Sequence, residues 1–241
     1  ICEITNFYKL YLIPNSRIVD HIVQNMDEVN ELNAKAVEKG FAEYQSGIGV
    51  GDFLMKDTDG NGTITSDDRQ VIATPEPKFF GGWTNTFTYK NLSLSFLMQF
   101  SCGGEAVYSN LGEEISGVLG QSVGRELYGN TWTPERTDAK YARLVAGTMS
   151  YNYMANDRFV FDTSYLRMKN ITLSYSLPKA WINKLYLSNA SLFVTATNLF
   201  TITQWPGLDP ETVATGITSM GTNNDPYPLS RSFSLGVKLQ F

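Results

Sequence analysis

The last ten residues of the chain, Ser232 to Phe241, read SFSLGVKLQF. Every second residue of this stretch is apolar, and the residues between them are small or polar. Because successive side chains of a β-strand point to opposite faces, the stretch predicts a strand with one apolar face and one polar face.

Earlier stretches show the same alternation, and they cover residues 79–90, 92–100, 165–177 and 190–203. In the third stretch the phase changes between Met168 and Ile171, which predicts a β-bulge near Lys169 and Asn170. The fourth stretch is interrupted at Asn198. Each stretch runs for about 10 residues, which matches a tilted membrane-spanning strand of about 9–11 residues better than a soluble strand of about 5–6.

The connections between these stretches alternate in length: residues 90–91 and 178–189 are short, and residues 101–162 and 204–231 are long. Alternation alone fits a soluble antiparallel sandwich as well as a membrane barrel. Short turns on one side and long loops on the other are typical of outer-membrane barrels. We therefore expect an all-β fold, an antiparallel transmembrane β-barrel fragment with long extracellular loops.

The composition excludes several other classes of protein. The chain has 241 residues, of which 13% are aromatic and 18% charged, and its net charge is -5. Disordered chains have fewer aromatic residues, and a nucleic-acid partner would require a basic surface. No apolar run approaches the roughly 20 residues of a membrane-spanning helix. The single histidine, His21, excludes mechanisms with two imidazoles, and the distant Cys2 and Cys102 fit no zinc spacing.

Residues 57–68, DTDGNGTITSDD, resemble a calcium-binding loop. Its expected ligands are Asp57, Asp59, Asn61, the backbone carbonyl of Thr63, Thr65 and Asp68. Gly62 occupies the sharp turn. The loop departs from an EF-hand because Asp68 is one methylene shorter than the usual Glu and the preceding residues lack a helical apolar stripe. A solvated Asp/Asn-Gly turn is the alternative. We favour a structural Ca²⁺, because three converging carboxylates would repel one another without a cation.

Other motifs carry weaker signals. Residues 120–124 match the G-x-S-x-G nucleophile motif, but they lie in a long loop and His21 precedes them, so we expect no enzyme. The glycines of residues 47–51 are expected to form a flexible loop rather than a phosphate site. Residues 20–39 predict an amphipathic helix with the apolar stripe Val23, Met26, Val29 and Val37.

Aromatic residues are frequent in the predicted long loops. They are Tyr108, Tyr128, Trp132, Tyr141, Tyr151, Tyr153 and Trp205. Exposed rings could stack on sugars or contact a partner, whereas buried rings would fold the loops onto one another and contribute to the interfacial aromatic girdle. We favour the second interpretation.

Several stretches, in order, resemble the C-terminal part of SusC/RagA-type TonB-dependent outer-membrane transporters. They are VGDFLMKDTDGNGTITSDDRQVI (50–72), PEPKFFGGWTNTFTYKNLSLSFLMQF (75–100), SYLRMKNITLSYSLP (164–178), ATNLFTIT (196–203), GLDPE (207–211) and YPLSRSFSLGVKLQF (227–241). Strand parity in such a barrel would make the loop of residues 57–68 extracellular and residues 232–241 the final strand.

The resemblance implies that residues 1–241 are the C-terminal portion of a barrel of about 22 strands, without its N-terminal plug. It also implies nutrient uptake across the bacterial outer membrane, with oligosaccharide or peptide as cargo. The implied partners are a SusD-like surface lipoprotein, TonB through the absent N-terminal part, and the lipid bilayer. The competing interpretation is a soluble, calcium-stabilised β-sandwich that binds carbohydrate.

Overall fold

The computed structural model describes residues 15–116, 123–145, 151–183, 186–212 and 227–241. The chain divides into two compact units. We call residues 76–104, 162–212 and 227–241 the sheet unit, and residues 1–75, 105–161 and 213–226 the loop unit. Each unit is described by itself.

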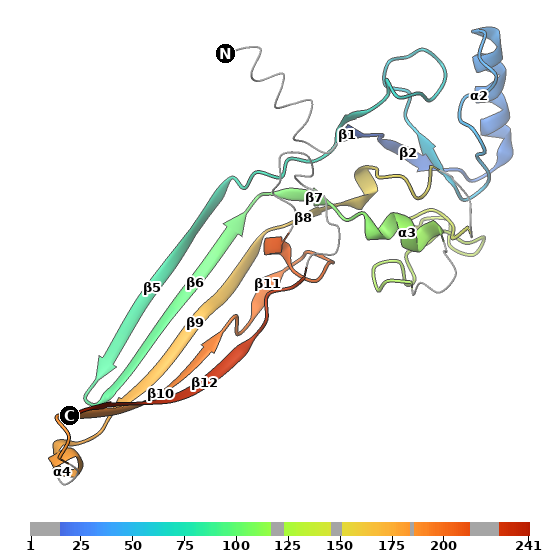
Figure 1. Cartoon of the computed structure of the whole chain (residues 1–241). Coiled ribbons are helices and arrows are strands. Elements are labelled where there is room, and N and C mark those ends of the chain that lie inside the picture. Colours follow the sequence, from blue (N-terminus) through green and yellow to red (C-terminus); the bar gives the residue numbers. More distant parts are fainter. Residues whose placement is uncertain (1–14, 117–122, 146–150, 184–185, 213–226) are drawn as a thin grey trace, which may run out of the picture. The chain divides into compact units, whose positions relative to one another are not determined.

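The sheet unit is built on one six-stranded antiparallel sheet, whose long strands lie side by side in Figure 1. Its strands are β5 (Phe79–Tyr89), β6 (Leu92–Cys102), β9 (Tyr165–Ser176), β10 (Asn189–Thr197), β11 (Thr201–Thr203) and β12 (Ser232–Gln240). Their order is β12-β10-β9-β6-β5, and β11 pairs with β9. The alternating stretches of the sequence therefore form the strands, as expected.

The register aligns the apolar residues of the strands in rows on one face. One row is Tyr89, Leu92, Tyr175, Leu192 and Val237, and the next is Phe87, Leu94, Leu173, Val194 and Leu235. The opposite face carries rows such as Thr86, Ser95, Thr172, Thr195 and Ser234. Hydroxyl groups bond across the strands there, for example Thr172 to Thr195 at 2.9 Å. The sheet thus has one apolar and one polar face.

The predicted bulge is present in β9. Leu97 pairs with Asn170 and Met98 pairs with Met168, so Lys169 is the extra residue. The interruption at Asn198 is also confirmed, since β10 ends at Thr197 and Asn198 adopts a φ of 49°. The Asn198 N–H donates to the Lys169 carbonyl oxygen at 3.0 Å, so the two irregularities are directly bonded.

The two short connections lie at the same end of the sheet (Figure 1). Lys90, with a φ of 52°, turns the chain between β5 and β6. The longer connection between β9 and β10 contains α4 (Lys179–Ile182), on which Trp181 is exposed. These turns confirm the short side of the predicted alternation.

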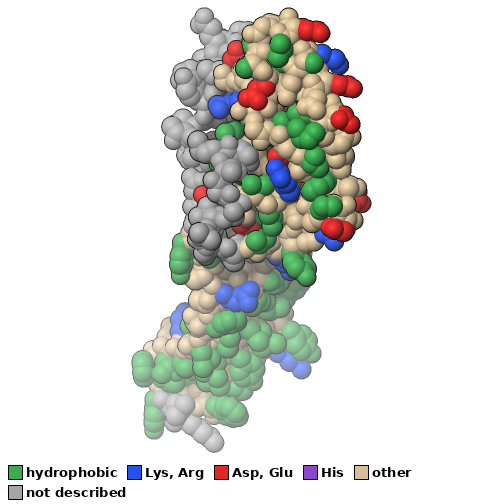
Figure 2. All heavy atoms as spheres, turned by 90° about the vertical axis from the view of Figure 1, so that its right-hand side faces the viewer, with side chains coloured by type: hydrophobic (Ala, Val, Ile, Leu, Met, Phe, Trp, Pro, Cys, Tyr) green, Lys and Arg blue, Asp and Glu red, His purple; other side chains and the backbone are tan. Residues whose placement is uncertain are grey.

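The apolar face of the sheet is open to its surroundings. Leu235 is 79% exposed, and the hydrophobic side chains gather over the strands in Figure 2. Within the described part of the sheet unit, no second sheet covers this face. A soluble sandwich would bury it, so the alternative drawn from the sequence is not supported.

The loop unit contains three short two-stranded sheets around a core of its own. The pairs are β1 (Asn15–Ser16) with β4 (Gln70–Val71), β2 (Val19–Ile22) with β3 (Phe53–Met55), and β7 (Glu105–Val107) with β8 (Val160–Asp162). The helical elements are α2 (Met26–Glu38), α3 (Asn110–Ser116) and the 3₁₀ turn Asp157–Phe159. Phe53, Leu111, Tyr141 and Phe159 are fully buried together. The described parts of the long loop between β6 and β9 therefore contribute to a folded core.

The helix predicted for residues 20–39 was placed too early. Residues 19–22 form β2 because they pair with β3, and α2 begins at Met26 after Asn25, whose side chain accepts hydrogen bonds from two N–H groups of the first turn. Val29 and Ala36 are its buried residues, whereas Val37, expected in the stripe, is 59% exposed. No helix among the described residues is long and apolar enough to cross a membrane.

Candidate functional site: a carboxylate loop and a buried charge cluster

The loop of residues 57–68 follows β3 and brings three carboxylates together. One oxygen from each of Asp57, Asp59 and Asp68 lies within 4.8 Å of the others. The chain turns through Gly60 and Gly62, with φ values of 77° and 100°. Glycine adopts these conformations without the steric cost of a Cβ atom. Gly62 therefore forms the sharp turn predicted from the sequence.

Asp68 anchors this loop through burial and hydrogen bonds. It is completely buried, and its carboxylate accepts hydrogen bonds from the N–H groups of Thr58 and Thr65, both at 2.7 Å. Burial alone would raise the pKa of Asp68, but the backbone N–H donors of Thr65 and Thr58 hold that pKa below its usual value. Asp68 is therefore ionised at neutral pH.

Asp57 and Asp59 accept hydrogen bonds inside the turn. Asp57 accepts from the N–H groups of Gly60 and Gly62 at 2.7 and 2.8 Å. Asp59 accepts from the N–H and the side-chain amide of Asn61 at 2.9 and 2.8 Å. These bonds are typical of Asp-Gly turns with or without an ion.

The side chains of Asn61, Thr63 and Thr65, the other residues predicted to supply ligands, take part in hydrogen bonds. The amide oxygen of Asn61 accepts from the Thr63 N–H at 2.8 Å, and the Thr63 hydroxyl donates to the Glu43 carbonyl at 2.8 Å. The Thr65 hydroxyl accepts from the Asp67 N–H at 3.1 Å. The structure thus gathers the three carboxylates, and the side-chain oxygens of Asn61 and Thr65 accept hydrogen bonds within the loop.

Two cationic side chains reach the same loop. Arg17 donates to the Thr65 carbonyl at 2.8 Å, and Lys39, the residue after α2, donates to the Gly60 carbonyl at 3.1 Å. Ile64 is buried in the core of the loop unit. The loop is therefore held to the protein on both sides of the carboxylates.

A second cluster of charges lies on the polar face of the sheet, and no motif in the sequence predicted it. Arg167 of β9 is buried and contacts Asp209 at 2.5 Å and Glu211 at 2.8 Å. Lys169, the bulge residue, contacts Glu211 at 2.6 Å. Asp209 and Glu211 belong to the GLDPE stretch, so this cluster holds the chain after β11 against β9.

The pKa of Asp209 reflects this environment. Burial by itself would raise the pKa, but the Arg167 guanidinium and the N–H groups of Glu211 and Leu229 lower it. Arg167 and Asp209 are 42 residues apart in sequence. Arg167 and Lys169 are the charged residues of the 165–177 stretch, and their position in the sequence does not indicate their partners.

The N–H groups of three glycines in the two glycine motifs donate to acceptors within the protein. The N–H of Gly49 donates to Asp52 at 2.7 Å and that of Gly51 to the Val23 carbonyl at 2.8 Å, so both bond to the protein itself. Residues 120–122 of the G-x-S-x-G motif, including Ser122, lie outside the described residues. The Gly124 N–H donates to Glu114 at 2.8 Å.

Most of the aromatic residues predicted in the long loops pack into or against the core of the loop unit. Tyr141 is fully buried, and the rings of Tyr108, Trp132 and Tyr151 pack against the same core. Tyr128 differs from them because it is exposed. Cys102 is also exposed, at the end of β6, while Cys2 lies outside the described residues.

An antiparallel sheet of long strands, apolar on one face and polar on the other, with tight turns at one end, defines an outer-membrane β-barrel protein. The described strands form an open part of such a barrel. No family model matches the chain. Similarity to individual proteins identifies the family.

The chain is 32% identical over 209 residues to the TonB-dependent receptor P3 of Formosa agariphila, which aligns with 84% of the chain and 20% of the receptor. It is 32% identical over 190 residues to the TonB-dependent receptor SusC of Bacteroides thetaiotaomicron, covering 78% of the chain and 17% of SusC. The chain belongs to the SusC/RagA-type TonB-dependent receptors, which are proteins of the bacterial outer membrane.

Solved structures agree with this fold. The RagAB peptide importer in its open-open state matches with a TM-score of 0.62 and 19% identity, over 94% of this chain and 22% of that one. The RagAB peptide transporter matches with a TM-score of 0.62 and 22% identity, over 82% of this chain and 22% of that one. The chain spans about a fifth of the length of the relatives it matches.

Proposed function

We propose that the receptor containing this chain imports a nutrient across the outer membrane, with an oligosaccharide or a peptide as cargo. The observation that carries the proposal is the sheet itself, whose apolar rows suit lipid and whose hydroxyl-rich face suits a polar lumen. Energy would come from TonB through a part of the receptor outside this chain. The residues of this chain would supply barrel wall and loops, and no covalent step.

We also propose that a SusD-like surface lipoprotein binds over the loops. The loop unit supports this idea because it has a buried core of its own and acidic side chains on its surface (Figure 2). A folded loop offers a partner a fixed surface without a large ordering cost.

Transport assays test this function directly. In a strain that lacks the receptor, uptake of labelled oligosaccharides and labelled peptides should be lost for one of the two classes and restored by the wild-type gene. A strain that lacks TonB is the matched control and should show the same loss. Unchanged uptake of both classes in the deletion strain would contradict the proposal.

We propose in addition that residues 57–68 bind one structural Ca²⁺ through Asp57, Asp59, Asn61, Thr63, Thr65 and Asp68. Support comes from the three carboxylate oxygens within 4.8 Å of one another and from the low pKa of Asp68. Carboxylates in such proximity repel one another unless a cation binds between them. All the ligands would be oxygens, which Ca²⁺ prefers, so the ion would fix the loop rather than activate a substrate.

Limited proteolysis of the full-length receptor tests the ion. In wild-type protein, Ca²⁺ should slow cleavage near Gly60 and a chelator should accelerate it. The double variant Asp57→Asn/Asp59→Asn should be cleaved at one rate in both conditions. Asp67→Asn is the matched control, because Asp67 is exposed and outside the carboxylate cluster, and it should behave like wild type. If wild-type protein is cleaved near Gly60 at the same rate with and without Ca²⁺, the calcium site is contradicted and the loop is a solvated turn.

A further inference from the structure

The apolar face of the sheet ends sharply toward the long loops. Along β9 the residues on this face are apolar up to Leu166, and the next two in the same phase are Ser164 and Asp162. In β11 the apolar residue Ile202 is followed in phase by Gln204. Such a change from apolar to polar side chains on a lipid-facing surface marks the membrane interface.

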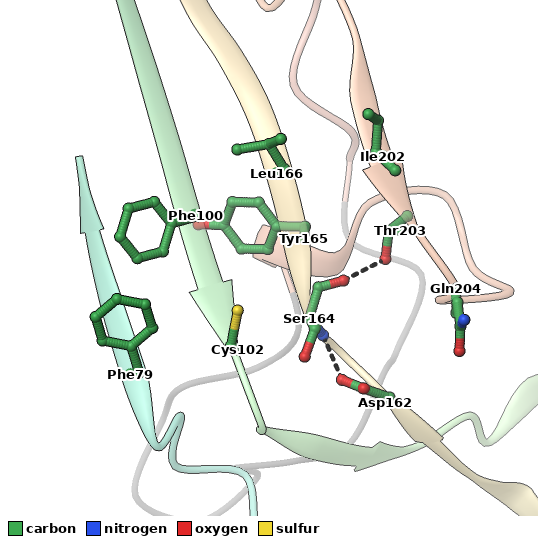
Figure 3. A pocket seen from close by; sticks show the side chains of 10 residues that line it. All are labelled: Phe79, Phe100, Cys102, Asp162, Ser164, Tyr165, Leu166, Ile202, Thr203 and Gln204. Atoms are coloured by element: carbon green, nitrogen blue, oxygen red, sulfur yellow. Dashed lines mark hydrogen bonds between the residues drawn. The ribbon is translucent and has the colours of Figure 1, made fainter. Parts of the chain in front are cut away.

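A hollow of about 670 Å³ lies on this boundary, within the sheet unit (Figure 3). Its lining residues are Phe79, Phe100, Cys102, Asp162, Ser164, Tyr165, Leu166, Ile202, Thr203 and Gln204. The volume falls in the range of about 300–1,000 Å³ that is usual for small-molecule pockets. Phe79 and Ile202 at its sides are 60% and 61% exposed, so the hollow opens on the apolar face.

The hollow arises from one row of the sheet. The register aligns Gly81, Phe100, Leu166 and Ile202 across four strands. The Phe100 ring lies over Gly81, where a Cβ atom would come within 2.9 Å of it, and contacts Phe79 with 4.8 Å between ring centroids. The ring therefore leans toward β5 and leaves space above Leu166.

The polar end of the hollow is held in a fixed shape. The Thr203 hydroxyl donates to the Ser164 carbonyl at 2.7 Å, and the Ser164 N–H donates to the Asp162 carboxylate at 2.6 Å (Figure 3). Asp162 is the one charged residue among the lining residues, and no Lys or Arg is among them. A phosphate group would find no cation there.

We propose that this hollow binds one acyl chain of an outer-membrane lipid. The apolar walls are continuous with the lipid-facing rows of the sheet, so the occupant that reaches them is lipid. The apolar part lies toward the membrane and the polar groups toward the loops, which matches a chain whose ester end lies at the interface. Recognition rests on the acyl chain, since the rim offers no cation to a headgroup phosphate. The inference depends on the membrane location of the chain and not on its cargo.

Photolabelling in a bilayer tests the proposal. The full-length receptor is reconstituted in phosphatidylethanolamine vesicles with a small fraction of the same lipid carrying a diazirine on its acyl chain, and labelled peptides are mapped by mass spectrometry. Labelling around Leu166 and Ile202 should saturate as the labelled fraction rises. Labelling around Leu235, on the same face but away from the hollow, should rise in proportion to that fraction.

The variant Leu166→Trp should fill the hollow and lower the labelling around Ile202. Exclusion of even two methylene groups corresponds to about a tenfold loss of affinity, which is read at a labelled fraction below saturation. Leu173→Trp, in the same strand and on the same face, is the control and should leave this labelling unchanged. Ile202→Trp replaces Leu166→Trp, with labelling read around Leu166, if the first variant does not assemble. Proportional labelling near Ile202 that neither filling variant reduces would overturn the proposal and indicate ordinary annular lipid.

Discussion

The sheet unit and the loop unit use apolar side chains in opposite ways. In the sheet unit Leu235 is 79% exposed, within apolar rows that cross the strands. In the loop unit Phe53 is completely buried and meets Phe159 edge to face. The loop unit therefore buries its apolar side chains by its own folding, whereas the sheet unit needs lipid to cover its apolar face.

Their buried charges differ as well. In the loop unit Asp52 is buried against Arg143 at 2.7 Å and the Asn152 amide at 2.7 Å, close to the core. In the sheet unit the buried charges are those around Arg167, on the polar face. Apolar exposure on one face and buried ion pairs on the other indicate a wall between lipid and a polar lumen.

The largest effect is expected from removal of Arg167, which tests the contrast between the buried charges of the two units. Arg167→Leu should lower the free energy of unfolding by about 3–5 kcal/mol, because Asp209 would remain buried without its cation. Urea unfolding of the full-length receptor in vesicles measures this loss. Arg231→Leu is the control, since Arg231 is exposed and should change stability little. Equal losses in both variants would mean that the cluster contributes no more than a surface charge.

The second prediction tests which face meets lipid. Leu235→Arg should cost about 2–4 kcal/mol if the side chain lies near the bilayer midplane. Ser234→Arg, on the polar face, should cost less. Gly236→Arg is a poor control, because a Cβ atom there would come within 2.3 Å of the Phe193 ring. Heat-modifiable gel migration gives the folded fraction, and equal losses at positions 234 and 235 would contradict a lipid-facing side.

The third prediction concerns acid. The folded-state pKa of Asp68 is lowered from 3.8, so its stabilising effect is complete above that value and is lost as the pH falls through the folded-state pKa. Hydrogen exchange at the amides of Thr58 and Thr65 should accelerate, relative to the intrinsic exchange rate, only below about pH 4. Asp68→Asn should remove this pH dependence. If exchange at these amides already accelerates at pH 6, a group other than Asp68 controls the stability of the loop.

The smallest effect is expected at His21, whose ring lies 2.9 Å from both Asp20 and Glu28. Burial lowers its pKa, but the two carboxylates raise it above 6.5 in total. The attraction is complete below pH 6.5 and is lost as the pH rises through the folded-state pKa. Exchange of the first turn of α2 should quicken slightly from pH 6 to 8 relative to His21→Gln. Identical profiles for both proteins would contradict the linkage.

The sheet could be predicted closely because its information is local. Alternation located β5, β6 and β12, and the phase change located the bulge at Lys169. The turn glycine Gly62 could be placed from its spacing in the loop alone. In each case the residue and its structural consequence lie within a few positions of one another.

The features that were predicted wrongly or not at all from the sequence depend on contacts between residues far apart in the chain. Residues 19–22 form a strand because they pair with β3, and this pairing overrides the local helical pattern. The partners of Arg167 and the folding of the long loop around Tyr141 depend on segments brought together only in three dimensions. The apolar hollow required the register of four strands, which the sequence did not supply.

The bulge in β9 bears on how such strands change length during evolution. Because Lys169 and Asn170 together face the single residue Leu97, loss of Lys169 would restore regular pairing and leave Leu166 and Ile171 on their present face. A one-residue deletion elsewhere in the strand would move every following side chain to the wrong side. Among descendants of this sequence, insertions and deletions within β9 should therefore accumulate at this one position.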